Sequence, residues 1–313
     1  MATTTTSNLS ANQKALGIYF DTRVIESLQP HLYFEQFGTV ETVPEGNYTS
    51  RFFAFNRIAT SDVSQLSTEG TGPTAIAVSV SAVDITPTQY GVSVEMTDLV
   101  ALTAVFQLVN TTLTEVGKAM ARKIDEVIQT VVNAGNNVIY SGNKTSRSDL
   151  TSSDLIAVTD IFKAVQRLRR NAAPEYPGGG YACVMHPAVA YDLMVSAGTG
   201  ASYWEMHKYA QPENLFRGEI GSIAGARIVQ SPNVQTFAST VTVYPTTLIA
   251  ADAYRISYWL ARKVNTYVYP PENAVSVNNQ LGQKGWVGAK TNIGVARTQE
   301  ERLMRIESAA TAL

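Results

Sequence analysis

The feature that most constrains the fold is a stretch from Thr97 to Gly135 in which apolar residues recur at helical spacing without a proline. The spacing predicts one helix from Thr112 to Ala134, with Thr112 and Glu115 as a capping box and Gly135 as a left-handed stop. At about 1.5 Å per residue this helix, called the spine helix below, is roughly 35 Å long and crosses a whole domain. Its predicted buried face consists of Leu113, Val116, Met120, Ile124, Val127, Ile128 and Val131.

Strand patterns precede the spine helix. An aromatic-rich run from Tyr48 to Phe55 and an alternating run from Ala75 to Ile85 predict two strands. The segment between them, about Ala59 to Gly72, is polar and cannot nucleate a core, so the pair predicts a long projecting hairpin. A third strand, Tyr90 to Met96, leads into the spine helix. Residues up to about 16 are small and polar and predict an arm that becomes ordered only on a neighbour.

The middle of the chain predicts a compact α/β unit with its own core. Ser153 is expected to cap a second amphipathic helix, whose predicted inward residues are Leu155, Val158, Phe162, Val165 and Leu168. A short helix through Met194 follows His186-Pro187. The predicted strands are Tyr181 to Met185, Ala226 to Gln230, Val241 to Val243 and Thr246 to Ala250. A later strand, Trp286 to Arg297, is expected to pair back with the early strands, which makes the domain of the spine helix discontinuous in sequence.

Composition and charge narrow the function. Hydrophobic residues make up 45% of the 313 residues and charged residues only 16%, so much of the surface is weakly charged, as contact surfaces are. The net charge is −2 and the sequence has no blocks of like charge, so strong sequence-independent binding to nucleic acid, which depends on positive charge, is not expected. The single cysteine, Cys183, excludes an intrachain disulfide and a cysteine-based zinc cluster. No apolar segment approaches transmembrane length, which predicts a protein without a membrane partner.

Residues for chemistry are scattered. The three histidines, His31, His186 and His207, stand far apart in the sequence with no carboxylate pair beside them. Residues 142–145 (GNKT) are only faintly similar to a phosphate-binding loop, because an asparagine separates the glycine from the lysine. The sequence therefore predicts no catalytic, cofactor-binding or metal-binding residue, and a protein that is not an enzyme.

Four stretches carry a resemblance to a known family: residues 88–98 (TQYGVSVEMTD), 134–140 (AGNNVIY), the pair His186-Pro187 and residues 219–227 (EIGSIAGAR). With the order of the predicted parts, they make the chain similar to tailed-bacteriophage major capsid proteins of the Hong Kong 97-type fold, in a podophage-type branch. The resemblance implies an α+β capsid fold in four parts. These are an N-terminal arm (1–45), an extended loop formed by the hairpin (46–86), a peripheral domain with the spine helix (87–149 and 251–313) and an axial domain (150–250).

The resemblance also implies the function. The expected role is self-assembly into the hexamers and pentamers of an icosahedral head that encloses double-stranded DNA without binding it specifically. The implied partners are a separate scaffolding protein and a portal, with a cementing protein as an optional addition. The implied location is the virion, after assembly in the host bacterial cytoplasm. Two alternatives stay open at this point: an encapsulin-like shell around protein cargo, and a soluble two-domain α/β enzyme.

Residues of the extended loop are the expected assembly residues. Four charged side chains are candidates for contacts with a neighbouring subunit: Arg51, Arg57, Asp62 and Glu69. Some relatives join their subunits by an isopeptide bond from a lysine of this loop. No lysine lies between Lys14 and Lys118, and the guanidinium of an arginine stays protonated and is not a nucleophilic amine. The loop is therefore expected to make noncovalent contacts only.

Overall fold

The computed structural model describes residues 33–44, 46–55, 58, 62–63, 72, 75–103, 108–195, 219–259, 264–271, 274 and 279–311. The predicted N-terminal arm up to residue 32 lies outside these residues, as do most of the hairpin tip, His31 and His207. The chain divides into two compact units. Unit 1 contains Met1–Leu28, Ser93–Val116 and Thr266–Gly288, and unit 2 contains Gln29–Val92, Gly117–Asn265 and Ala289–Leu313.

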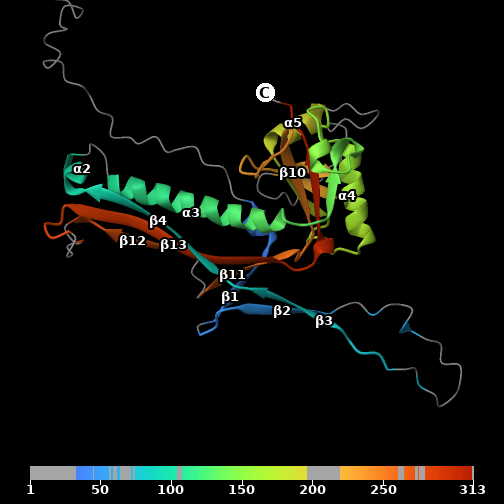
Figure 1. Cartoon of the computed structure of the whole chain (residues 1–313), viewed down its shortest axis with the longest axis horizontal. Helices are drawn as coiled ribbons and strands as arrows, with labels where there is room; N and C mark the ends of the chain where they lie inside the picture. Colours follow the sequence, from blue (N-terminus) through green and yellow to red (C-terminus); the bar gives the residue numbers. More distant parts are fainter. Residues whose placement is uncertain are drawn as a thin grey trace, which may run out of the picture. The chain divides into compact units, whose positions relative to one another are not determined.

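The largest sheet belongs to unit 2 and has seven strands, in the order β5-β14-β10-β6-β8-β7 with β9 pairing β10. Its strand β10 is labelled in Figure 1. Its strands are β5 (Val138–Tyr140), β6 (Tyr181–Met185), β7 (Glu219–Ile223), β8 (Ala226–Gln230), β9 (Phe237–Ala238), β10 (Thr242–Ile249) and β14 (Leu303–Ser308). β14 runs antiparallel to β10 and parallel to β5, and β6 runs parallel to β8. The sheet therefore takes β5 and β14 from outside residues 150–250.

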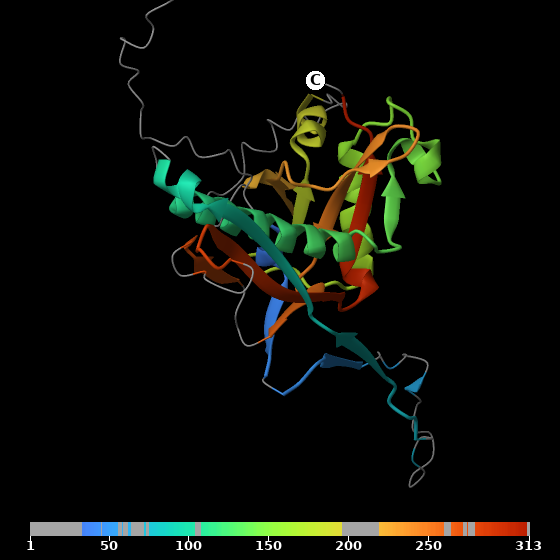
Figure 2. The same cartoon turned by 60° about the vertical axis from the view of Figure 1, so that its left-hand side comes forward.

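Helices cover both faces of this sheet. Successive residues of β6 point to opposite faces, with Cys183 on one and Val184 on the other, and both are fully buried. The helices α4 (Val158–Arg170) and α5 (Pro187–Val195) pack on the face of Cys183 (Figures 1 and 2). Residues 117–132 of the spine helix, α3 (Leu108–Val132), pack on the other face. Because both faces are covered, β6 is apolar at every position and lacks a polar alternation.

A second sheet has the order β1-β11-β13-β12, with β4 pairing β13. Its strands are β1 (Thr39–Val43), β4 (Thr88–Thr97), β11 (Tyr254–Trp259), β12 (Asn265–Tyr269) and β13 (Lys284–Arg297). The pairing of β13 with β4 confirms the predicted return of this late strand to an early one. Two short helices complete the list, α1 (Phe34–Phe37) and α2 (Asp98–Thr103), and the predicted hairpin is the two-stranded sheet of β2 (Ser50–Phe55) and β3 (Val80–Ile85).

The spine helix is confirmed, but both of its predicted ends are wrong. Thr112 lies inside α3, which is already helical from Leu108, so Thr112 and Glu115 form no capping box. The last helical residue is Val132, and Gly135 does not have a positive φ. Gly135 is required for a different reason, because a Cβ there would lie 2.9 Å from Glu300 Oε1. That oxygen accepts the N–H of Asn136 at 2.5 Å, so Gly135 allows the chain to approach the carboxylate.

The second predicted helix is also confirmed with corrections. α4 begins at Val158, and Asp160 accepts the N–H of Ala157, so Ser153 is not its cap. Phe162 was expected inside but is 43% exposed, while Ile161 is buried in its place. The two strands predicted between Val241 and Ala250 are one strand, β10. β14 was not predicted at all.

Candidate assembly surfaces

The hairpin presents two chemically different faces. Its register pairs Ser50 with Ile85 and Phe55 with Val80, so alternate cross-strand pairs share a face. The inner face contains Phe52, Val83 and Ile85, and it is anchored within unit 2. The guanidinium of Arg255 lies 4.5 Å from the centre of the Phe52 ring, and Ile85 is fully buried near Gly294. Tyr48, just before β2, contacts the ring of Trp259.

The outer face of the hairpin contains the pairs Arg51/Asp84 and Phe53/Ala82, together with Val80. Phe53 is 66% exposed and Val80 is 46% exposed. Before β3, Ile76 and Val78 are exposed as well. An isolated two-stranded ribbon is marginally stable in water, and large exposed apolar side chains on it mark an interaction surface. The outer face is therefore a candidate contact with another subunit.

The predicted loop residues differ in what the structure reports of them. Arg51 forms a two-pronged ion pair within the hairpin, with Nε 2.7 Å from Asp84 Oδ1 and Nη2 2.8 Å from Asp84 Oδ2. The hydrogen bond from Arg51 lowers the pKa of the Asp84 carboxyl. Asp62 is exposed. Arg57 and Glu69 lie outside the described residues. The assembly role of all four remains a prediction.

The predicted buried face of the spine helix lies where it was expected for most of its length. Val116, Met120, Ile124 and Ile128 are buried, whereas Leu113, Val127 and Val131 are half-buried. Val132, at the end of the helix, is buried as well. The helix therefore uses an apolar stripe for its own fold and leaves Arg122 and Glu126 exposed on another face.

A buried polar network fixes α3 to a loop of unit 2 and to α1. Asp125 is 1% exposed and accepts three hydrogen bonds, from the backbone N–H of Phe34, Gln129 Nε2 and Asn233 Nδ2. Burial raises the pKa of Asp125 above its ordinary value. Gln129 also accepts the N–H of Gln235 at 2.8 Å and donates to the carbonyl of Asn233. The sequence did not reveal this network, since its members are about a hundred residues apart.

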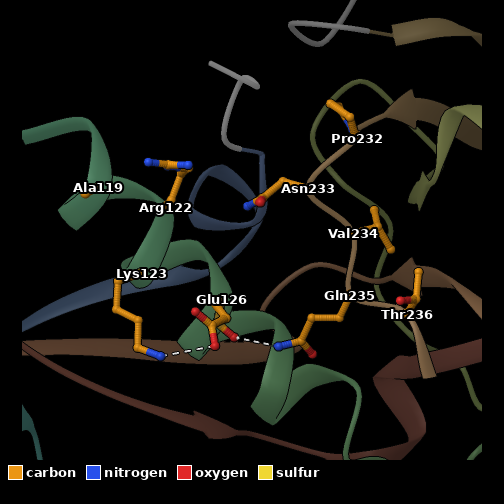
Figure 3. A pocket seen from close by; sticks show the side chains of 9 residues that line it. All are labelled: Ala119, Arg122, Lys123, Glu126, Pro232, Asn233, Val234, Gln235 and Thr236. Carbon is orange, nitrogen blue, oxygen red and sulfur yellow. Dashed lines mark hydrogen bonds and ion pairs between the residues drawn. The ribbon is translucent and has the colours of Figure 1, made fainter. Parts of the chain in front are cut away.

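Beside this network lies a groove of about 520 Å³ (Figure 3). One wall is α3 and the other is the loop 232–236; the lining residues are Ala119, Arg122, Lys123, Glu126, Pro232, Asn233, Val234, Gln235 and Thr236. Lys123 and Glu126 form an ion pair at 3.1 Å, and Gln235 Nε2 bonds the carbonyl of Glu126. The groove is lined by both polar and apolar side chains and its walls are joined by hydrogen bonds, so it is suited to a peptide segment.

Unit 1 carries its own exposed apolar residues. Leu99 and Leu102 of α2 are 67% and 81% exposed, and Leu281 is 82% exposed. They belong to one region, because the N–H of Asp98 donates to the carbonyl of Gln283 at 3.0 Å. Leucines this exposed are unusual together on a monomer and indicate a second contact surface.

The groups for which the sequence was searched for chemistry lie apart or are occupied in the described part of the structure. No three His, Cys, Asp or Glu side chains among them lie close enough to hold a metal ion, and none of the described helices is long and apolar enough to cross a membrane. Burial raises the pKa of the Cys183 thiol to about 12 and lowers the pKa of His186, which packs on Tyr244. A Cβ at Gly142 would lie 2.1 Å from Asp154 Oδ1, so a carboxylate occupies the turn that is faintly similar to a phosphate-binding loop.

Comparisons with known proteins identify the family and the fold of this chain. The family model described as phage capsid protein matches residues 80–287. No curated protein matches the sequence significantly. The capsid protein of Ralstonia phage GP4 is 14% identical with a TM-score of 0.72, covering 99% of both chains. The capsid of cyanophage P-SCSP1u is 16% identical with a TM-score of 0.68, covering 96% of this chain and 94% of that one.

A third capsid, that of cyanophage Pam1, is 10% identical with a TM-score of 0.72 and covers 96% of this chain and 98% of that one. These structural matches establish a shared α+β capsid fold over nearly the whole chain, and the family model covers about two thirds of it. The chain therefore belongs to the phage capsid protein family, as a major capsid protein of the phage head shell.

Proposed function

We propose that this chain assembles with itself into the hexamers and pentamers of an icosahedral head that encloses double-stranded DNA. The observation that best supports this is the outer face of the hairpin, where Phe53 and Val80 are exposed. A neighbouring subunit that covers this face removes the apolar side chains from water. Many such contacts of modest area add up to a closed shell. The role is structural, and the location is the virion capsid.

In this proposal the four parts have separate tasks. The arm (1–45) packs in unit 2 through α1 and β1, and its earlier residues, with the extended loop (46–86), reach neighbouring subunits. The peripheral domain (87–149 and 251–313) carries the spine helix, and the axial domain (150–250) meets its copies at the centre of each capsomer. The axial core is completed by β5 and β14, which come from the peripheral ranges. Removal of β14 is thus expected to harm the axial domain directly.

The proposed partners are a separate scaffolding protein and a portal, with a cementing protein where the shell requires reinforcement. DNA is held by enclosure, and the net charge of −2 supports this, since a near-neutral wall does not bind a polyanion strongly. Assembly in the host bacterial cytoplasm is part of the same proposal. The family match favours this function over the encapsulin-like shell and the α/β enzyme.

The test is expression of the chain with and without its cognate scaffolding protein, followed by light scattering and electron microscopy. Closed shells built of hexamers and pentamers are the expected result, and heads isolated after infection are expected to contain DNA. A compact monomer at every concentration and salt, with the scaffold present, contradicts the proposal. Shells filled with a cellular enzyme instead of DNA favour the encapsulin-like alternative.

A further inference from the structure

The groove between α3 and the loop 232–236 has the properties of a preformed docking site. Its floor is held by the hydrogen bonds of Gln129 to the carbonyl of Asn233 and to the N–H of Gln235, each shorter than 3 Å. Gln235 Nε2 also bonds Thr130 Oγ1 at 2.9 Å. Because both walls are fixed to each other, a segment that binds in the groove meets a surface that is already shaped.

The charge of the groove is set by Arg122. Lys123 and Glu126 neutralise each other through their ion pair, and Figure 3 shows Arg122 directed away from both. Within the described part of the chain, the guanidinium of Arg122 has no ion-pair partner. The groove therefore offers one unbalanced positive charge to an incoming segment, which favours an acidic occupant.

We propose that the occupant is the hairpin tip of a second copy of this chain, with Arg122 as the anchor for its carboxylates. Residues 58–79 contain Asp62 and Glu69 and no lysine or arginine. Residues 1–32, the other segment with a potential to reach out, contain Lys14, Arg23, Asp21 and Glu26, so their side-chain charges cancel. Charge complementarity therefore selects the tip.

Length permits the contact between subunits. β2 ends at Phe55 and β3 begins at Val80, and the connecting residues span up to about 40 Å at about 3.3 Å per residue. The groove volume of about 520 Å³ accommodates only a few residues, so the acidic tip alone enters it. This inference rests on the proposed self-assembly and names the surface that receives the hairpin.

The first experiment is a charge exchange. Arg122→Glu is expected to raise the protein concentration needed for half-maximal assembly about fivefold, since an exposed attractive pair becomes a repulsive one. Asp62→Arg together with Glu69→Arg is expected to restore assembly in the Arg122→Glu background. The matched control is Arg170→Glu, which makes the same change at an exposed arginine of α4. Equal effects of the two single reversals, or no rescue, overturn the proposal.

The second experiment is disulfide trapping. The native Cys183 is buried, so it is not expected to form disulfides with the introduced cysteines. Shells with Ser64→Cys and Thr236→Cys are expected to give linked chains under mild oxidation. Shells with Ser64→Cys and Tyr191→Cys, an exposed position on α5, are expected to stay unlinked. Linkage of Thr236→Cys to Asn12→Cys instead shows that the arm occupies the groove, and overturns the proposal. Normal shells without any link contradict the groove alone, whereas the absence of shells in every wild-type preparation contradicts self-assembly itself.

Discussion

Glu307 is a fully buried carboxylate held between two arginines. Arg147 binds it through Nε at 2.7 Å and Nη2 at 2.6 Å, and Arg305 Nε lies 2.8 Å from Oε1. The guanidinium of Arg147 also lies 4.0 Å from the centre of the Phe237 ring. Two cations therefore depend on one buried anion, which makes the removal of that anion more costly than the pair itself is stabilising.

We expect Glu307→Gln to lower the free energy of unfolding by about 3–5 kcal/mol, because Arg305, which is nearly buried, loses its counter-ion. Urea unfolding of the unassembled chain measures this. Glu301→Gln, the same chemical change on an exposed side chain, is the control and is expected to have little effect. Equal unfolding free energies for the two variants would show that the cluster is not coupled to stability.

Asp125 is expected to make the free energy of unfolding depend on pH. Its pKa is raised by burial, so the folded state binds a proton more readily than the unfolded state. Its contribution is therefore complete below the ordinary aspartate pKa of about 4 and is lost as the pH rises through the higher folded value. The unfolding free energy of the wild type minus that of Asp125→Asn is expected to fall as the pH rises above about 4. A constant or rising difference in urea unfolding contradicts this.

Among the elements, the hairpin is the one whose loss is expected to prevent assembly while the subunit still folds. Replacing residues 61–70 by a short turn is expected to leave the cores of both units in place, since the residues that form those cores in the described part of the chain lie elsewhere. Circular dichroism is expected to be unchanged, while negative-stain images are expected to lack normal shells. Arg51→Glu, which alters only a half-exposed pair, is the milder comparison. Normal shells from the shortened chain would make the hairpin dispensable.

The elements that were predicted well are those whose pattern is local. The strands β6 and β8 and the helix α5 have Gly or Pro at or near their ends, and β6 is apolar throughout. β14 was missed because Arg305 and Glu307 interrupt its apolar pattern, and only a tertiary ion cluster allows them inside. The end of α3 was predicted wrongly because Gly135 does not stop the helix. Its lack of a side chain instead leaves room for Glu300, a residue distant in the sequence.

The candidate site divides in the same way. The hairpin could be predicted because a polar segment separates two strand patterns. The exposure of Phe53 could also have been predicted, because alternate residues of a strand lie on opposite faces. The groove was not predictable, because Arg122 and Gln235 meet only through the fold. Phe162 was placed inside by helical spacing alone, whereas the sheet is covered by Ile161, Val165 and Leu168.

For the whole molecule, the mature shell is expected to be held by noncovalent contacts. The extended loop has no lysine for an isopeptide bond, because no lysine lies between Lys14 and Lys118. Cys183 is buried, and burial raises the pKa of its thiol to about 12. Boiled particles on a denaturing gel are therefore expected to give one band near 33.9 kDa. Particles boiled with and without reductant should look the same. A ladder of linked multimers would contradict this prediction.

The position of β14 has a consequence for synthesis on the ribosome. It follows every other strand of the seven-stranded sheet in the sequence, yet it lies between β5 and β10 and pairs with both. Val138 of β5 pairs with Arg305 of β14, so the parallel pair can form only after residue 305 has been synthesised. Pairing between residues so far apart in the sequence is slow. Until then β10 has an open edge, which is a hazard for aggregation. The seven-stranded sheet of a nascent chain is therefore expected to be completed only after β14 has been translated, so a subunit competent for assembly requires the synthesis of that strand.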